Sequence, residues 1–245
     1  MEFPDYPFAP NYVDLDGLRM HYVDEGEGKP VLFLHGEPTW SFLWRHCIPR
    51  VVESGRRAIA PDLIGFGKSH KPEDQGWYTY DRHGEVVTRF VRELDLRDIA
   101  LVVHDWGGLI GLRFAVENAE RVERLVILDT GVWSGKAPSE TWLRFREAVR
   151  SVGGEIDIAR LVESGTQRGL TDEIRAAYNA PFPTRSRKRA RSPSRSSSPS
   201  SPDIQPRRHS SPSAMAWPGG TNRRTSSGAA RTPCCRQRSP NASSH

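Results

Sequence analysis

One short segment places a carboxylate between a predicted strand and a predicted helix. Residues 101–108 read LVVHDWGG, and they lie between an apolar run and an amphipathic stretch. A sharp strand-to-helix turn projects one side chain as a nucleophile, and in this turn that side chain belongs to Asp105. A carboxylate attacks carbon directly to form an ester, and it is ionised at neutral pH without a base. The alternative is that Asp105 only caps the following helix.

Two further loops follow predicted strands. Residues 35–40 read HGEPTW and come directly after the apolar run 31–34. Residues 61–69 read PDLIGFGKS and follow another short strand. The second loop contains glycines but lacks the GxxxxGK[ST] spacing, so we discount a phosphate-binding role for it.

The elements that would position these loops alternate between strands and helices. Such alternation predicts a doubly wound α/β domain. Further along, the alternation stops and helix-like stretches remain, as expected of a helical insertion over the carboxyl edge of a sheet. The predicted strands are 12–15, 18–23, 31–34, 58–60, 99–103 and 125–128; the predicted helices are 41–53, 81–96, 108–118, 140–149, 157–163 and 171–178.

Charge divides the 245-residue chain into two unlike parts. Residues 1–183 carry a net charge of −7, whereas residues 184–245 carry +12, which together give +5. The second part holds 16 Ser, 12 Arg and 8 Pro, and Ile204 is its only Val, Ile, Leu or Phe, so we expect it to be disordered. The three cysteines form no disulfide framework or CxxC metal site. Because we find neither a signal peptide nor an apolar run of ~20 residues, we expect a cytoplasmic protein without a membrane span.

Four motifs in order resemble those of the haloalkane dehalogenases. They are HGEPTWSFLWR (35–45), PDLIGFGKS (61–69), VVHDWGGLIGLR (102–113) and APFP (180–183). The resemblance implies an α/β-hydrolase fold, incomplete at its C-terminus. Its core would span 1–131, the start of a helical cap 132–183, and a disordered basic tail 184–245.

The resemblance also implies roles for particular residues in the hydrolysis of a haloalkane to a primary alcohol and halide. Asp105 would displace the halide and form an alkyl ester. The indole N–H of Trp106 would bind the halide, with Trp142 as the candidate second donor. The backbone N–H groups of Glu37 and Trp106 would form the oxyanion hole. The partners are then a small haloalkane and a halide ion, with no cofactor or metal, and the folded chain is expected to be a monomer.

The second half of the reaction lacks a base in this sequence. Ester hydrolysis in the family needs a late His oriented by an acid. Only His209 and His245 follow the nucleophile, and both lie in the basic tail. Asp129 is the candidate acid, but without a His it has nothing to orient. We therefore expect the chain to form the ester and to be inactive in turnover.

Residues 184–245 replace expected fold elements with an Arg/Ser/Pro-rich composition, which out-of-frame reading of GC-rich DNA would produce. We therefore hypothesise a frameshift near codon 184. A gene sequence in which no other frame continues the fold would contradict it. Two alternatives remain open: an epoxide hydrolase-like enzyme, and a non-catalytic protein whose basic tail binds nucleic acid without sequence specificity.

Overall fold

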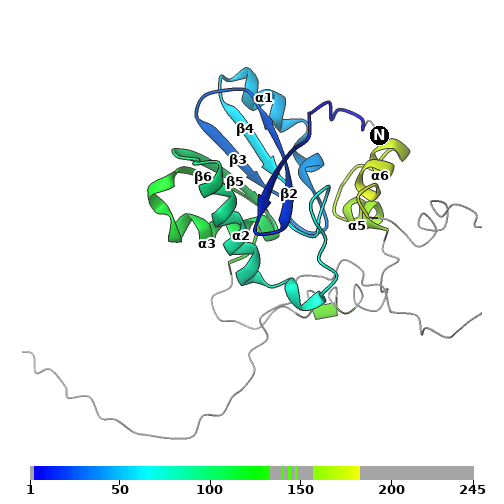
Figure 1. Ribbon diagram of the computed structural model, residues 1–245. Coiled ribbons are helices and arrows are strands. Elements are labelled where there is room, and N and C mark those ends of the chain that lie inside the picture. Colours follow the sequence, from blue (N-terminus) through cyan, green and yellow to red (C-terminus); the bar gives the residue numbers. More distant parts are fainter. Residues whose placement is uncertain (1–2, 133–139, 141–142, 145–146, 148–156, 183–245) are drawn as a thin grey trace, which may run out of the picture.

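The computed structural model describes residues 3–132, 140, 143–144, 147 and 157–182 (Figure 1). Their centre is a six-stranded sheet with the order β1-β2-β4-β3-β5-β6. The β1–β2 and β2–β4 pairs are antiparallel, and the β4–β3, β3–β5 and β5–β6 pairs are parallel. The strands are β1 (Asn11–Leu15), β2 (Leu18–Glu25), β3 (Pro30–Leu34), β4 (Arg57–Pro61), β5 (Ile99–His104) and β6 (Val122–Leu128). All six predicted strands are present at shifted bounds.

Helices connect the parallel strands and add a separate pair near the end of the described chain. Helix α2 packs against α3, which also contacts three of the four parallel strands, β3, β5 and β6. Side chains cap three of the helices: Thr79 caps α2, Asp157 caps α5 and Thr171 caps α6. The helices are α1 (Cys47–Glu53), α2 (Tyr80–Glu93), α3 (Trp106–Glu117), α5 (Ile158–Ser164) and α6 (Asp172–Asn179).

The prediction of one continuous helix over 41–53 is wrong, because this segment forms two separate elements. A 3-10 turn spans Ser41–Trp44, and α1 begins only at Cys47. Pro49 explains the break, since its ring nitrogen has no hydrogen to donate to the carbonyl of Arg45 one turn earlier. Most of the predicted helix 140–149 and the tail 184–245 lie outside the described residues.

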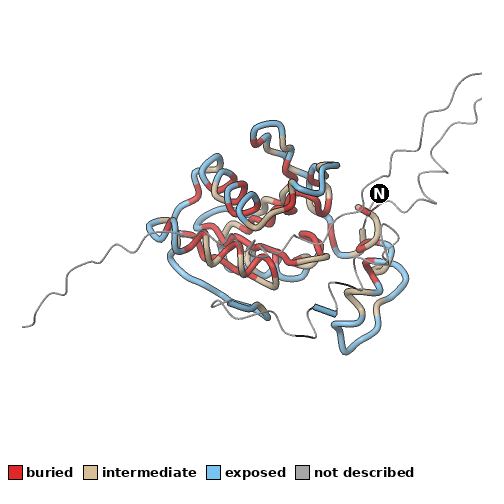
Figure 2. The backbone as a smooth tube through the Cα atoms, turned by 90° about the horizontal axis from the view of Figure 1, so that it is seen from below, coloured by how far each residue is buried: buried red, intermediate tan, exposed pale blue. Residues whose placement is uncertain are grey.

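The buried core centres on the middle strands, and the second helix pair joins it (Figure 2). Every residue of β3 is buried, as is typical of a parallel strand covered on both faces. Tyr178 of α6 packs edge-on against Phe42, with ring centroids 5.1 Å apart. Phe182 lies 6.4 Å from Phe66 in the same way. Helices α5 and α6 are therefore anchored over the segments that follow β3 and β4.

Strand β6 differs from the other parallel strands because it is exposed. Leu125, Val126, Ile127 and Leu128 are 42, 40, 53 and 41 % exposed. Adjacent residues of a strand point to opposite faces, so both faces of β6 are open. Within the described residues β6 pairs only with β5, which leaves its outer edge unpaired. An apolar edge of this kind is a site of self-association.

We predict that Ile127→Lys reduces this association, because a lysine on an edge strand disfavours pairing with another chain. The measurement is static light scattering of the full chain against concentration. The matched control is Val116→Lys on α3, where the valine is 82 % exposed but lies off the sheet edge. A parent chain that stays monomeric, or an equal effect of both lysines, contradicts the prediction.

Candidate active site

Asp105 lies at a strained turn between β5 and α3. Its φ is 51° and its ψ is −124°, a conformation that non-glycine residues rarely adopt. It occupies the N-cap position of α3, yet its side chain makes no capping hydrogen bond. The helix-cap interpretation of this residue therefore does not explain its side chain. Strain of this type costs about 1–3 kcal/mol and persists only where neighbouring structure enforces it.

The segment directly after β6 and the first turn of α3 hold this conformation. The Asp105 carbonyl accepts hydrogen bonds from the Thr130 hydroxyl at 2.7 Å and from the Gly108 N–H at 2.9 Å. The Asp105 N–H donates to the Asp129 carbonyl at 3.2 Å. A Cβ on Gly108 would meet Thr130 Oγ1 at 2.1 Å, so glycine is required for the close approach.

The loop after β3 supplies a backbone donor to the carboxylate. The Glu37 N–H donates to Asp105 Oδ1 at 2.8 Å. Gly36 makes this approach possible, because a Cβ there would lie 2.2 Å from the same oxygen. The backbone N–H of Trp106 is at the first position of α3, where no helical carbonyl is available to accept it. The structure thus brings together three of the predicted site residues: Asp105, Glu37 and Trp106.

A buried carboxylate braces the loop after β3. Asp62 is fully buried and accepts hydrogen bonds from the Ser41 N–H, His21 Nδ1 and the Lys68 N–H at 2.7–2.8 Å. Burial alone would raise the pKa of Asp62, but the hydrogen bond and charge of His21, with His35 and the Lys68 N–H, hold it at about 2. The Asp62 carboxylate therefore stays ionised at neutral pH.

Two histidines, His35 and His104, belong to the segments that meet at Asp105, and neither ring contacts its carboxylate. His35 is fully buried, with Nδ1 bonded to the Gly36 carbonyl at 2.9 Å and Nε2 accepting from the Leu63 N–H at 2.9 Å. Burial lowers the pKa of His35, so the ring is neutral and both nitrogens are committed. His104 lies edge-on to Trp44, 6.5 Å between ring centroids. Among the described residues, no histidine ring hydrogen-bonds to Asp105.

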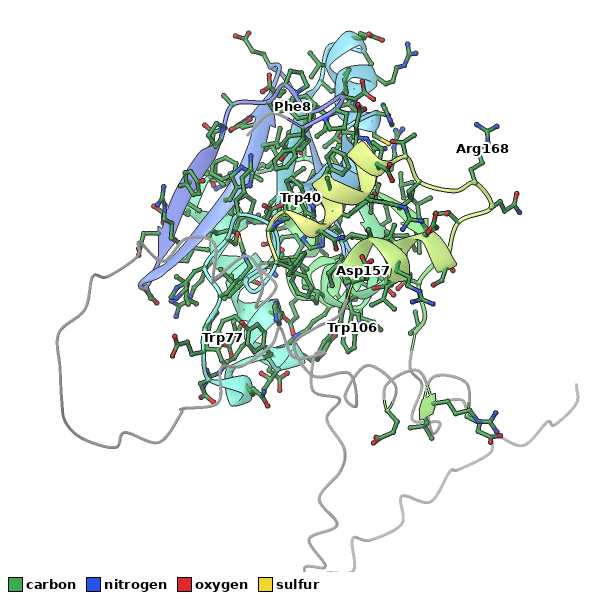
Figure 3. The ribbon with its side chains drawn as sticks, turned by 90° about the vertical axis from the view of Figure 1, so that its right-hand side faces the viewer. Phe8, Trp40, Trp77, Trp106, Asp157 and Arg168 are labelled. Carbon is green, nitrogen blue, oxygen red and sulfur yellow. The ribbon has the colours of Figure 1, made fainter. Side chains whose placement is uncertain are left out.

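The remaining predicted residues are placed as follows. Asp129 directly follows β6, and its carboxylate is exposed while its carbonyl binds the Asp105 N–H. Trp106 is 9 % exposed. Trp142 lies outside the described residues. Figure 3 looks onto α5 and α6 and labels Trp40, which stacks on Phe42 in the aromatic layer beneath α6.

Sequence reasoning missed the residues that support the nucleophile. Thr130 is a short polar residue in a loop that no motif marks, and Thr39 stands in the recognised HGEPTW segment without a role having been predicted for it. Asp62 stands in the recognised PDLIGFGKS segment, but its bonds to Ser41 and His21 join parts of the chain far apart in sequence. One usable signal is position, because Thr130 comes just after the strand that neighbours β5.

Comparison with known proteins places this geometry in a family. A sequence model of the alpha/beta hydrolase fold matches residues 29–205, more than half of the chain. The chain is an α/β-hydrolase. This α/β-hydrolase is 44 % identical over 188 residues to a haloalkane dehalogenase of Mycobacterium marinum, covering 74 % of the chain and 63 % of the relative. It is 43 % identical over 198 residues to one of Psychrobacter cryohalolentis, covering 76 % and 63 %.

Solved structures of a haloalkane dehalogenase and an epoxide hydrolase also match this chain. The tetrameric structure of a haloalkane dehalogenase from Paraglaciecola agarilytica matches with a TM-score of 0.71 and 37 % identity, covering 76 % of this α/β-hydrolase and 64 % of that chain. An epoxide hydrolase from Vigna radiata matches with a TM-score of 0.61 and 25 % identity, covering 71 % and 67 %. The resemblance to haloalkane dehalogenases is confirmed.

The match is partial in length. This α/β-hydrolase spans about 63 % of the length of the curated relatives that it matches. No helix in the described part of the chain is long and apolar enough to cross a membrane.

We predict that Gly36→Ala disrupts the contact between the loop and the nucleophile. The new methyl group would displace the Asp105 carboxylate, and overpacking of this kind costs about 1–3 kcal/mol of stability. The control is Gly131→Ala, where an added Cβ meets nothing within 4 Å. Urea denaturation of the full chain measures the effect. Equal stabilities of the two variants contradict the close approach.

We predict that lowering the pH below about 6.5 reduces the free energy of unfolding because of His83. This residue is 1 % exposed and lies edge-on to Trp77. Burial first, and repulsion from the His35 ring once that ring is protonated at low pH second, lower its pKa to about 3. Between about 6.5 and 3 the unfolded chain binds a proton that the folded chain does not. His83 therefore contributes stability above about pH 6.5 that is lost as pH falls, by about 1.4 kcal/mol per pH unit.

The variant His83→Phe keeps the aromatic packing and removes the titrating group, so the pH slope should become smaller. The control is His46→Gln, whose side chain is 63 % exposed. Urea midpoints between pH 7 and 5 measure both slopes. Identical slopes in parent and His83→Phe contradict the assignment.

Proposed function

We propose that this α/β-hydrolase carries the nucleophilic half of a hydrolytic haloalkane dehalogenase. The observation that carries the proposal is the Asp105 carboxylate, which accepts the Glu37 N–H at Oδ1 and does not cap its own helix. This leaves Oδ2 as the attacking oxygen. Haloalkane dehalogenases at 42–44 % identity support the choice of substrate class.

The first step is an in-line displacement. Asp105 Oδ2 forms a bond to the halogen-bearing carbon, and the carbon–halogen bond breaks with its electron pair leaving on the halide. The product is an alkyl ester of Asp105 and a halide ion. We propose that the indole N–H of Trp106 binds the departing halide, because this group only donates hydrogen bonds. Trp142 is proposed as a second donor.

The second step adds water to the ester carbonyl. The Asp105 Oδ1 then takes up negative charge, which the Glu37 and Trp106 N–H groups would stabilise. Cleavage between the carbonyl carbon and Oδ2 releases the alcohol. This step needs a base to take the proton from water, and His35, which lies in the loop after β3, is committed to structural hydrogen bonds. We therefore propose that the ester accumulates in this chain.

Helices α5 and α6 are proposed as part of a cap over the substrate site. Their support is the packing of Tyr178 and Phe182 on Phe42 and Phe66, which follow β3 and β4. The carboxyl ends of these two strands lead into the HGEPTW and PDLIGFGKS loops, which carry the family resemblance. A cap there would exclude water from the displacement step.

Epoxide hydrolysis is the second candidate, favoured by the likeness to the Vigna radiata structure. That reaction would need cap tyrosines to protonate the opening epoxide. Tyr178 is the only tyrosine after Tyr80, and its ring is 3 % exposed and packed on Phe42. Dehalogenation is therefore the better supported function.

We predict that the full chain releases about one bromide per molecule from a primary bromoalkane and then stops. Asp105→Asn should lower the rate of this burst at least about a thousandfold, because an amide is a poor nucleophile. The matched control is Asp98→Asn, an aspartate with a similar φ of 52° on the loop before β5. Bromide release is followed by ion chromatography.

Two results would contradict the proposal in different ways. Many turnovers by the parent would show that a base is present after all. A burst that survives Asp105→Asn would show that another group is alkylated.

A further inference from the structure

The peptide group between Gly36 and Glu37 is held on its carbonyl side by three donors. The Gly36 carbonyl accepts from the Thr39 hydroxyl at 2.8 Å, from the Thr39 N–H at 2.9 Å and from His35 Nδ1 at 2.9 Å. Thr39 is 6 % exposed and His35 is fully buried. Water therefore does not compete freely for this carbonyl.

The same peptide group carries the donor to the nucleophile. In a planar trans peptide the C=O and the N–H point in opposite directions. Fixing the direction of the Gly36 carbonyl thus fixes the direction of the Glu37 N–H, which reaches Asp105 Oδ1 at 2.8 Å. Hydrogen bonds accepted by a carbonyl also polarise the N–H of its own peptide and strengthen the bond that it donates.

The protonation of His35 suits this arrangement. Its Nε2 accepts from the Leu63 N–H, so the ring proton is on Nδ1 and is donated to the Gly36 carbonyl. The Leu63 N–H is in turn part of the loop that begins with the buried Asp62. The Gly36–Glu37 peptide group is therefore linked directly to Asp105 and, through His35, to Leu63.

We propose that Thr39 is a positioning residue, whose hydroxyl, through the Gly36 carbonyl, aims and polarises the Glu37 N–H at the nucleophile. This inference rests on the proposed function, since the oxyanion of the ester step is what the donor would stabilise. Thr39 does not touch the reacting atoms. Its effect should be largest on the ester, whose carbonyl oxygen is Oδ1 of Asp105.

The test uses the full chain loaded with the alkyl ester from a primary bromoalkane. Isotope-edited infrared spectroscopy of ¹³C-labelled aspartate reports the ester carbonyl stretch, which moves to lower frequency when the carbonyl accepts a stronger hydrogen bond. Thr39→Val is expected to move the stretch to higher frequency. It should also slow spontaneous ester hydrolysis about fivefold, the loss of one neutral hydrogen bond.

Three further variants complete the test. Thr39→Ser restores the hydroxyl and should restore both readouts to within about twofold of the parent. Thr39→Ala removes the hydroxyl without a branched side chain and replaces the valine variant if that chain does not fold. The matched control is Thr88→Val, because the Thr88 hydroxyl also donates to a backbone carbonyl, that of Gly84, but within α2.

The outcomes separate this inference from the proposed function. If the parent forms no ester, the proposed function fails and the inference falls with it. If the ester forms but its stretch and lifetime are the same in the parent and in the Thr39→Val or Thr39→Ala chain, the positioning role is overturned and the proposed function stands. An equal change in Thr88→Val also overturns the positioning role.

Discussion

The candidate site depends on one hydrogen bond between the ends of two neighbouring parallel strands. The Glu37 N–H, after β3, meets Asp105 Oδ1, after β5, at 2.8 Å. Each side of this contact is costly to maintain, because Asp105 has a positive φ and Gly36 must lie against the carboxylate without a Cβ. The structure offsets that cost with hydrogen bonds that the Thr130 and Thr39 hydroxyls donate and with those that the buried Asp62 carboxylate accepts. The scaffold thus holds a carboxylate that does not cap its own helix, as the proposed nucleophilic role requires.

Much of the fold follows from the sequence because its signals are local. Apolar runs predicted the parallel strands, and the HDWGG segment predicted the sharp strand-to-helix turn at Asp105. The continuous helix over 41–53 failed because Pro49 breaks the hydrogen-bond ladder at Arg45, a local effect that helical periodicity hides. The supports of the site could not be predicted. Asp62, for example, bonds to Ser41 and His21, which lie 21 and 41 positions earlier in the chain.

Strand β6 is less buried than the other parallel strands of the described chain. Strands β3 and β5 are buried on both faces, whereas four successive apolar residues of β6 are 40–53 % exposed. Relatives of this α/β-hydrolase are longer, since it spans about 63 % of their length. The nucleophile and its backbone donor are nevertheless assembled on the inner side of β6, from β3, β5 and the loops that follow them.

Peptide mapping by mass spectrometry, after the full chain reacts with a primary bromoalkane, tests the central claim most directly. The account predicts one stable alkyl group, on Asp105. The exposed thiol of Cys47 serves as an internal reference for non-specific alkylation. An unmodified Asp105, with alkyl groups on cysteine alone, would contradict the account, because a carboxylate prepared for attack would then not react.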